Sequence, residues 1–397
     1  MTDGGIRLLL IYSSGVAHKY SWLDTLRIAF KTNTLSKLFP EKIREYKLIK
    51  LLLGNSYEAL SYVIDWLEAF QSLKGVKKIN LCNINNLIEY KYFAKKMAEY
   101  DWVVILHSAT GDNIHLLNQT AHYYHSAKKL TMFIGNEYDL MEEKIDFISQ
   151  AGVKYICSQL TEETAKWLYE DIHQKVKLVM MPHALNPNIY FPSKETTHRE
   201  IDIGFKGDLY PLWVGDTVRN DFLLKISENE FNLNIDITLN QRVGRVKWAE
   251  FLNKTNAIVG AESGSLYLDK KGIMLKEAKK FLAENPMTSI KDLKATIFDQ
   301  LNVEFKSGRA ISSRHFEPIG TKTCQILLEG HYNGILQAGQ HYIAVHPDLS
   351  NLKEAIALYK DVTYRDQIVE QAYEYVLESH TYHKRIEYLK EIVERDK

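Results

Sequence analysis

The sequence has few cysteines, and their spacing pairs none of them. Cys82, Cys157 and Cys324 are the three cysteines among 397 residues, and no Cys-x-x-Cys pair occurs. This pattern supplies neither a disulfide framework nor the clustered thiolates of a zinc site. We therefore expect three reduced, buried thiols, as is typical of a cytoplasmic protein.

Long hydrophobic runs and the phosphate signatures of common enzyme classes are also missing. The apolar stretch at residues 8–12 is too short for a signal peptide or a membrane span. The sequence has no GxGxxG and no Walker loop, which argues against dehydrogenases and P-loop kinases. No Asp-x-Asp pair follows a predicted strand, and the histidines at 331, 341 and 346 lack the spacing of metal ligands. We expect no metal site and no prosthetic group.

Neither sign of charge is in excess, with 50 basic and 50 acidic residues. A neutral chain has no long-range attraction to nucleic acid, so we expect no nucleic-acid partner. Residues 27–50 are a local exception, with seven basic and two acidic residues. This segment predicts either a solvated helical face or peripheral contact with an anionic membrane surface.

Short β-type runs alternate with longer helical patterns along most of the chain, which predicts an α/β protein with parallel sheets. In the first half, strands are expected at residues 7–12, 78–82, 102–107, 131–134, 155–157 and 178–181. In the second half they are expected at 202–205, 231–237, 257–259, 310–312, 334–336 and 342–345.

A chain of this length suits two domains, and three prolines between residues 177 and 192 predict a stiff linker between them. The predicted domains are residues 1–184 and 185–375, the second with a helical insertion at about 267–308. Residues 376–397 are predicted to form a last helix that crosses back to the first domain. Because open parallel sheets bind ligands at the carboxyl ends of their strands, two facing sheets would create a cleft between the domains.

The segment 311–329 carries the clearest chemical signal. Ser312, Ser313, Arg314 and His315 run directly into Phe316 and Glu317, and an apolar helix-like stretch follows. Free amides at a helix N-terminus, hydroxyl groups and a guanidinium together bind a diphosphate. A carboxylate one turn further on can hold a ribose. The order of these groups predicts a nucleotide-sugar site.

Several passages resemble a known family. Residues 178–192 are similar to the inter-domain passage of glycosyltransferases with the two-domain GT-B architecture, and residues 202–208 with Arg219 resemble the start of their donor domain. Residues 314–317, with Thr381 and Tyr382 before Arg385, resemble the glycosyltransferases related to the spore maturation protein CgeB and the group 1 glycosyltransferase C-terminal domain. The resemblance implies two facing Rossmann-like domains.

The resemblance also implies roles for donor-binding residues. A carboxylate at the Glu317 position holds the ribose of the donor, and a second carboxylate eight residues earlier contacts the transferred sugar. Arg309 occupies that earlier position, so the paired-carboxylate pattern is broken. The remaining donor-binding candidates are Lys206, Arg219, Glu262, Ser263, Ser312, Ser313, Arg314, His315 and Thr321.

Candidates outside the donor domain follow predicted strands of the first half. Ser14 and Gly15 follow the first strand and could approach the acceptor. His107 and Glu137 are candidate catalytic bases, because each lies at or after a strand's carboxyl end. Each of these candidates has a structural alternative, such as a buried histidine that only packs, or a carboxylate that only pairs.

These residues and the resemblance together predict a metal-independent glycosyltransferase, and the resemblance alone implies a setting in surface polysaccharide or glycoconjugate synthesis. A UDP- or GDP-sugar would be the donor and a glycan or lipid-linked molecule the acceptor, in the cytoplasm or at the inner face of the membrane. Two alternatives stay open: a nucleotide-sugar epimerase of the same architecture, and a non-catalytic nucleotide-sugar-binding or assembly protein, which Arg309 favours. The sequence leaves the oligomeric state open.

Overall fold

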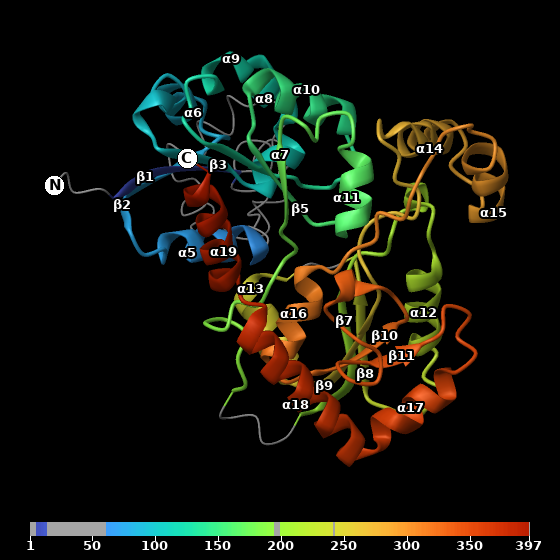
Figure 1. The fold of residues 1–397 in the computed structure, drawn as a ribbon. Coiled ribbons are helices and arrows are strands. Elements are labelled where there is room, and N and C mark those ends of the chain that lie inside the picture. Colours follow the sequence, from blue (N-terminus) through green and yellow to red (C-terminus); the bar gives the residue numbers. More distant parts are fainter. Residues whose placement is uncertain (1–4, 14–60, 194–198, 241–242, 397) are drawn as a thin grey trace, which may run out of the picture. The chain divides into compact units, whose positions relative to one another are not determined.

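Two β-sheets organise this chain (Figure 1). The computed structural model describes residues 5–13, 61–193, 199–240 and 243–396. The chain divides into two compact units. The first comprises Met1–Asn136, Glu142–Cys157 and Asp171–Val179; the second comprises Glu137–Met141, Ser158–Glu170 and Met180–Lys397.

The first sheet has six strands in the order β2-β1-β3-β4-β5-β6. The strands are β1 (Ile6–Tyr12), β2 (Val76–Asn83), β3 (Trp102–Ile105), β4 (Leu130–Phe133), β5 (Tyr155–Ser158) and β6 (Lys177–Met180). The pairs β1–β2, β1–β3, β3–β4 and β4–β5 are parallel. Every residue of β3, β4 and β5 is buried, as expected for parallel strands that are covered on both faces.

Helices connect these strands. They are α5 (Ser61–Gln71), α6 (Leu87–Ala94), η2 (Met97–Glu99), α7 (His107–Asp112), α8 (Ile114–Gln119), α9 (Ala121–Tyr124), α10 (Met141–Ala151) and α11 (Glu162–Leu168). Local signals explain where some of them begin. Asn86 accepts a hydrogen bond from the Glu89 amide at the start of α6, and Thr161 accepts one from Thr164 at the start of α11.

The second sheet has five strands in the order β11-β10-β9-β7-β8, and all neighbours are parallel. The strands are β7 (Ile201–Gly207), β8 (Ile235–Leu239), β9 (Thr255–Gly260), β10 (Cys324–Leu328) and β11 (Ile343–Val345). Side chains alternate between its faces. Ala257 and Val259 point to one apolar core, and Ile258 points to the other.

Helices cover both faces of this sheet (Figure 1). One core contains residues of α13 (Arg245–Asn253), α16 (Ser313–Gly320) and α18 (Val362–Ser379). The opposite core contains residues of α12 (Val218–Ser227) and α17 (Leu352–Lys360). Short helices η3 (Leu212–Val214) and η5 (Tyr332–Gly334) lie in loops, and α19 (Tyr382–Arg395) ends the chain within the second unit.

A helical segment, here called the insertion, lies between β9 and α16. It contains α14 (Ile273–Glu284), α15 (Ile290–Leu293) and a π-helical turn, η4 (Lys294–Phe298). Antiparallel bridges Ser263–Ala310 and Leu268–Lys306 join the chain entering the insertion to the chain leaving it. Within the described part of the chain, no helix is both long and apolar enough to cross a membrane.

Three local predictions were wrong. Residues 310–312 do not form a named strand, because Ala310 makes one bridge and Ser312 then caps α16. Residues 334–336 begin with the last residue of η5, and Asn333 and Gly334 have positive φ angles. The apolar stretch after Glu317 is helical only to Gly320 and then becomes β10, which is buried throughout.

Candidate functional site

The strand order of the second sheet locates a ligand edge. Its first strand, β7, lies between β8 and β9. The chain adds β8 on one side of β7 and then adds β9, β10 and β11 on the other side, so the strand order reverses between β7 and β9. Ligands of open α/β sheets bind at the carboxyl ends of the strands at such a switch point. The loops that leave this edge are residues 208–217 after β7 and residues 261–265 after β9, and α16 begins close to the second loop.

The N-terminus of α16 is held against the loop after β9 by His315. The Ser312 amide donates to His315 Nδ1 at 3.0 Å, so the ring proton is on Nε2, which donates to the Ala261 carbonyl at 3.0 Å. Burial lowers the pKa of His315 to about 4, so the ring is neutral. His315 is therefore a clamp that fixes the helix start.

The first turn of α16 has open hydrogen-bond donors. Among the described residues, the amides of Ser313 and Arg314 have no acceptor. Helix N-termini carry a partial positive charge from such amides. Open amides at a helix start are suited to an anion, which is the ligand that the sequence predicts for Ser312 to Arg314.

Glu317 and Arg314 share a partner from another helix. Glu317 is 2% exposed, and its Oε2 accepts a 2.7 Å hydrogen bond from the Trp248 indole of α13. The Arg314 guanidinium lies 4.1 Å above the Trp248 ring and 4.0 Å from Glu317 Oε2. Phe251 stacks on Trp248 with ring centroids 5.4 Å apart. Arg314 Nη1 is buried and, within the described residues, has no hydrogen-bond partner.

Arg219, near the start of α12, brings a second guanidinium to the same region. It lies 3.5 Å above the Tyr210 ring and donates from Nη2 to the Asp208 carbonyl, while its buried Nε has no partner among the described residues. Burial lowers the pKa of Arg219; Tyr210, Asp216 and Asp208 oppose this shift, and the charge of Arg314 adds a smaller lowering. Two neighbouring, partly desolvated cations favour a bound anion.

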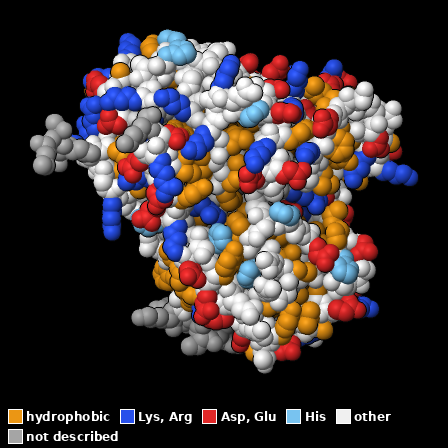
Figure 2. Space-filling model, viewed as in Figure 1, with side chains coloured by type: hydrophobic (Ala, Val, Ile, Leu, Met, Phe, Trp, Pro, Cys, Tyr) orange, Lys and Arg blue, Asp and Glu red, His pale blue; other side chains and the backbone are white. Residues whose placement is uncertain are grey.

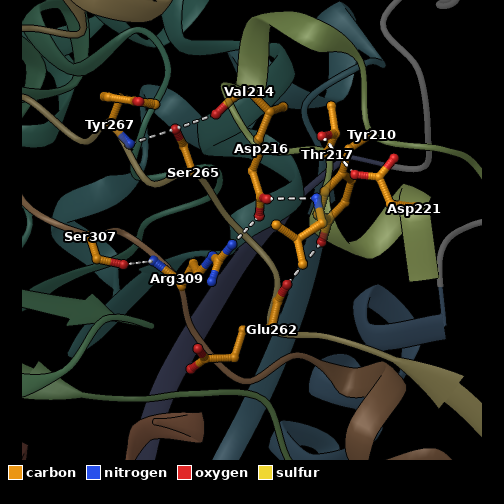
Figure 3. Close-up of polar contacts among 11 residues, drawn as sticks. Tyr210, Val214, Asp216, Thr217, Asp221, Glu262, Ser265, Tyr267, Ser307 and Arg309 are labelled. Carbon is orange, nitrogen blue, oxygen red and sulfur yellow. Dashed lines mark hydrogen bonds and ion pairs between the residues drawn. The ribbon is translucent and has the colours of Figure 1, made fainter. Parts of the chain in front are cut away.

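Arg309 forms an ion pair with Asp216 (Figure 3). Asp216 is buried, and its other oxygen accepts a 3.0 Å hydrogen bond from the Val218 amide at the start of α12. Arg309, which stands where a carboxylate was expected, thus links residues 307–310 to the loop after β7 through this ion pair.

Glu262 and Ser263 complete this edge. Glu262 is buried; its Oε1 accepts a 2.6 Å bond from the Tyr332 amide, and its carbonyl accepts one from the Tyr210 hydroxyl at 3.2 Å. The backbone of Ser263 pairs with Ala310 in both directions. Both residues shape the loop after β9.

Two predicted donor residues have other partners. Lys206 Nζ donates to Asp236 at 2.9 Å and Thr238 at 3.2 Å, both on the neighbouring strand β8. Thr321 follows the opposite end of α16 from Ser313, where it donates to the Pro318 carbonyl and contacts the Thr323 hydroxyl. The structure does not bring Thr321 together with the open helix end.

The candidate bases are both buried. His107 was expected to end a strand, but β3 ends at Ile105 and His107 begins α7; its ring lies 5.7 Å from Trp66 and 5.0 Å from Phe133. Glu137 accepts hydrogen bonds from the Ser158 and Tyr169 hydroxyls, each at 2.7 Å, and from the Gln159 amide at 2.8 Å. Three donors on one carboxylate indicate a structural role. Ser14, Gly15 and residues 27–50 lie outside the described residues.

Sequence reasoning missed Trp248, Tyr210 and Asp216. Tyr210 and Asp216 belong to the loop that follows a predicted strand, so the ligand-edge rule could have found them. No local signal marks Trp248, which contacts Glu317 across 69 residues of sequence. Within the described residues, no group of three His, Cys, Asp or Glu side chains could hold a metal ion.

Surface charge adds no competing site on the face in Figure 2, where Lys and Arg side chains are interspersed with Asp and Glu. Neither sign gathers into a large patch among the described residues on that face. A basic stripe of the kind that binds nucleic acid is therefore not seen there.

Comparisons with known proteins agree with the fold of this chain. Residues 270–391 match the family described as glycosyl transferase-like. An alpha-glucosyltransferase in complex with UDP and DNA is 9% identical, with a TM-score of 0.51 over 98% of this chain and 99% of that one. Anabaena HepE in complex with UDP-glucose is 8% identical, with a TM-score of 0.50 over 98% and 100%. No curated protein matches this sequence. The fold is thus the GT-B-like α/β fold that the sequence predicted.

Proposed function

We propose that this protein is a glycosyltransferase that binds a nucleoside diphosphate sugar at the carboxyl edge of its second sheet. The observation that carries the proposal is the pair Arg219 and Arg314, whose buried Nε and Nη1 atoms lack partners within the described residues beside the open N-terminus of α16. A diphosphate would supply acceptors to the guanidinium groups and to the helix amides at once.

The donor would lie along α16. Glu317, one turn into the helix, would accept hydrogen bonds from the ribose hydroxyls, with Trp248 holding its Oε2. The diphosphate would sit at Ser312, Ser313 and Arg314. The sugar would then lie beyond the helix end, toward Asp216 and Arg309. Solved proteins of this fold carry UDP or UDP-glucose, which supports a uridine donor.

Transfer moves the anomeric carbon of the sugar from a diphosphate oxygen to an acceptor hydroxyl. Negative charge grows on the departing diphosphate, and fixed donors at Arg219, Arg314 and the α16 amides would stabilise it without a metal ion. If the configuration inverts, a base must take the hydroxyl proton, and His107 and Glu137 stay predictions for that role, with Glu137 disfavoured by its three donors. We propose a glycan or lipid-linked acceptor and action in the cytoplasm.

A second candidate is a protein that binds nucleotide sugars without turnover. It is favoured by one observation: Arg309 stands where a sugar-contacting carboxylate is expected, and it is paired with Asp216. Such a protein would bind the donor and release no sugar from it.

A nucleotide panel tests the proposal. We expect UDP or GDP to raise the Tm of the full chain equally with Mg²⁺ and with EDTA, and UMP to have a smaller effect because it lacks the second phosphate. Absence of a shift with every nucleoside diphosphate would contradict the proposal. Slow release of glucose from bound UDP-glucose would favour the transferase, and binding without release would favour the second candidate.

A further inference from the structure

The insertion between β9 and α16 is in contact with the loop after β7, here called the donor loop (residues 208–217). This loop carries Asp216, and its first carbonyl, Asp208, accepts the hydrogen bond from Arg219. Its conformation therefore influences where two of the site's charged groups point. The contacts that hold this loop in one conformation come largely from the insertion.

The base of the insertion makes direct contacts with the donor-loop backbone. Ser265 is fully buried, and its Oγ donates to the Val214 carbonyl at 3.0 Å while accepting a 3.0 Å bond from the Tyr267 amide (Figure 3). Gly215 has a φ of 78°, and a Cβ on it would lie 2.4 Å from Tyr267 Cδ2. The Tyr267 ring thus packs directly against the loop backbone where only glycine fits.

The side chains of the donor loop also enter the core of the insertion. Leu212 and Trp213 pack against the cluster that contains Met274, Leu275 and Phe298. Tyr267 stacks on Phe298 with centroids 3.9 Å apart. Lys279 of α14 lies 4.4 Å above the Trp213 ring. The middle of the loop is therefore packed on the insertion.

We propose that the insertion is a brace that positions the donor loop, with Tyr267 as the positioning residue. This role rests on the proposed function, since it concerns the loop of that same site. Tyr267 acts through Gly215 and Val214 and touches no substrate.

The experiment compares three full-length variants. Tyr267→Ala removes the ring, and Tyr267→Phe retains it; the hydroxyl has no hydrogen bond among the described residues. Phe281→Ala is the matched control, because Phe281 packs on the same insertion core but has no ring contact or hydrogen bond to the donor loop among the described residues. The two measurements are hydrogen exchange of residues 208–217 and calorimetric titration with UDP.

The brace predicts faster exchange in residues 208–217 and a Kd for UDP raised about tenfold or more for Tyr267→Ala. Tyr267→Phe and Phe281→Ala should resemble the wild type in both measurements. Unchanged exchange in Tyr267→Ala would overturn the brace, and faster exchange with an unchanged Kd would overturn the positioning role. If the wild type bound no nucleoside diphosphate, the proposed function would fail, and exchange alone would still decide the brace.

Discussion

Arginines at the two edges of the second sheet differ in how many hydrogen bonds they make. At the amino edge, Arg199 precedes β7 and bonds four acceptors, which lie where α13 and α16 end and where β9 and β10 begin. These are the carbonyls of Leu252, Thr255 and Thr321 and the hydroxyl of Thr323, at 2.5 to 3.2 Å. At the carboxyl edge, Arg219 donates to one carbonyl, and Arg314 has no hydrogen bond within the described residues.

This difference distinguishes an arginine that stabilises the fold from the two arginines that we propose bind a diphosphate. Burial of a guanidinium is unfavourable unless its donors find acceptors. Arg199 satisfies that requirement inside the protein. Arg219 and Arg314 rely on aromatic rings, Tyr210 and Trp248, and leave buried nitrogens open. The oxygens of a bound diphosphate would accept hydrogen bonds from these nitrogens.

Arg199→Met should have the largest effect on stability. The change removes the guanidinium donor from three carbonyls and a hydroxyl, so we expect the free energy of unfolding to fall by about 3 kcal/mol or more. Urea denaturation followed by circular dichroism measures the loss. A fall below about 1 kcal/mol would show that the amino edge does not depend on this network.

Arg314→Met should affect binding instead. It removes a charge-assisted donor from the diphosphate, so we expect UDP affinity to fall roughly ten- to a hundredfold. Its unfolding free energy should change by less than about 1 kcal/mol, because the side chain has no hydrogen bond to lose among the described residues. Calorimetric titration with UDP is the measurement, and wild-type affinity in this variant would remove Arg314 from the site.

Trp248→Phe should have the smallest effect and sharpen the picture of the ribose contact. The variant keeps an aromatic ring beside Arg314 but deletes the hydrogen bond to Glu317. We expect UDP affinity to fall about fivefold, equivalent to one modest hydrogen bond. With 2′,3′-dideoxy-UDP, which has no ribose hydroxyls, the variant and the wild type should bind equally. An equal loss for both nucleotides would contradict the ribose role of Glu317.

Much of the fold could be predicted from alternating apolar runs. The strands expected at 7–12, 131–134 and 342–345 coincide closely with β1, β4 and β11. The failures have two causes. Residues 324–328 form a strand buried on both faces, which shows no alternation and cannot be distinguished from a buried helix by periodicity. Residues 310–312 and 334–336 are short apolar runs whose neighbours impose a helix cap and a left-handed turn.

The candidate site was only partly predictable, for a different reason. The order Ser-Arg-His-Phe-Glu places an anion site and a carboxylate on one helix, so Arg314 and Glu317 could be found locally. His315 was expected in the donor site, but its ring nitrogens bond Ser312 and Ala261. Trp248 contacts Glu317 across 69 residues of sequence, and no local pattern encodes that contact. Asp216 lies in the loop after a predicted strand, but its ion pair with Arg309 joins residues 93 positions apart.

The most direct test of the contrast between the two edges measures UDP affinity and urea stability together on Arg199→Met and Arg314→Met. We expect opposite results for the two variants. Arg199→Met should lose stability but keep wild-type UDP affinity under conditions in which it is folded. Arg314→Met should keep its stability and lose UDP affinity. Parallel losses in both variants, or a loss of stability alone in Arg314→Met, would contradict the claim that the carboxyl-edge arginines are kept open for a diphosphate.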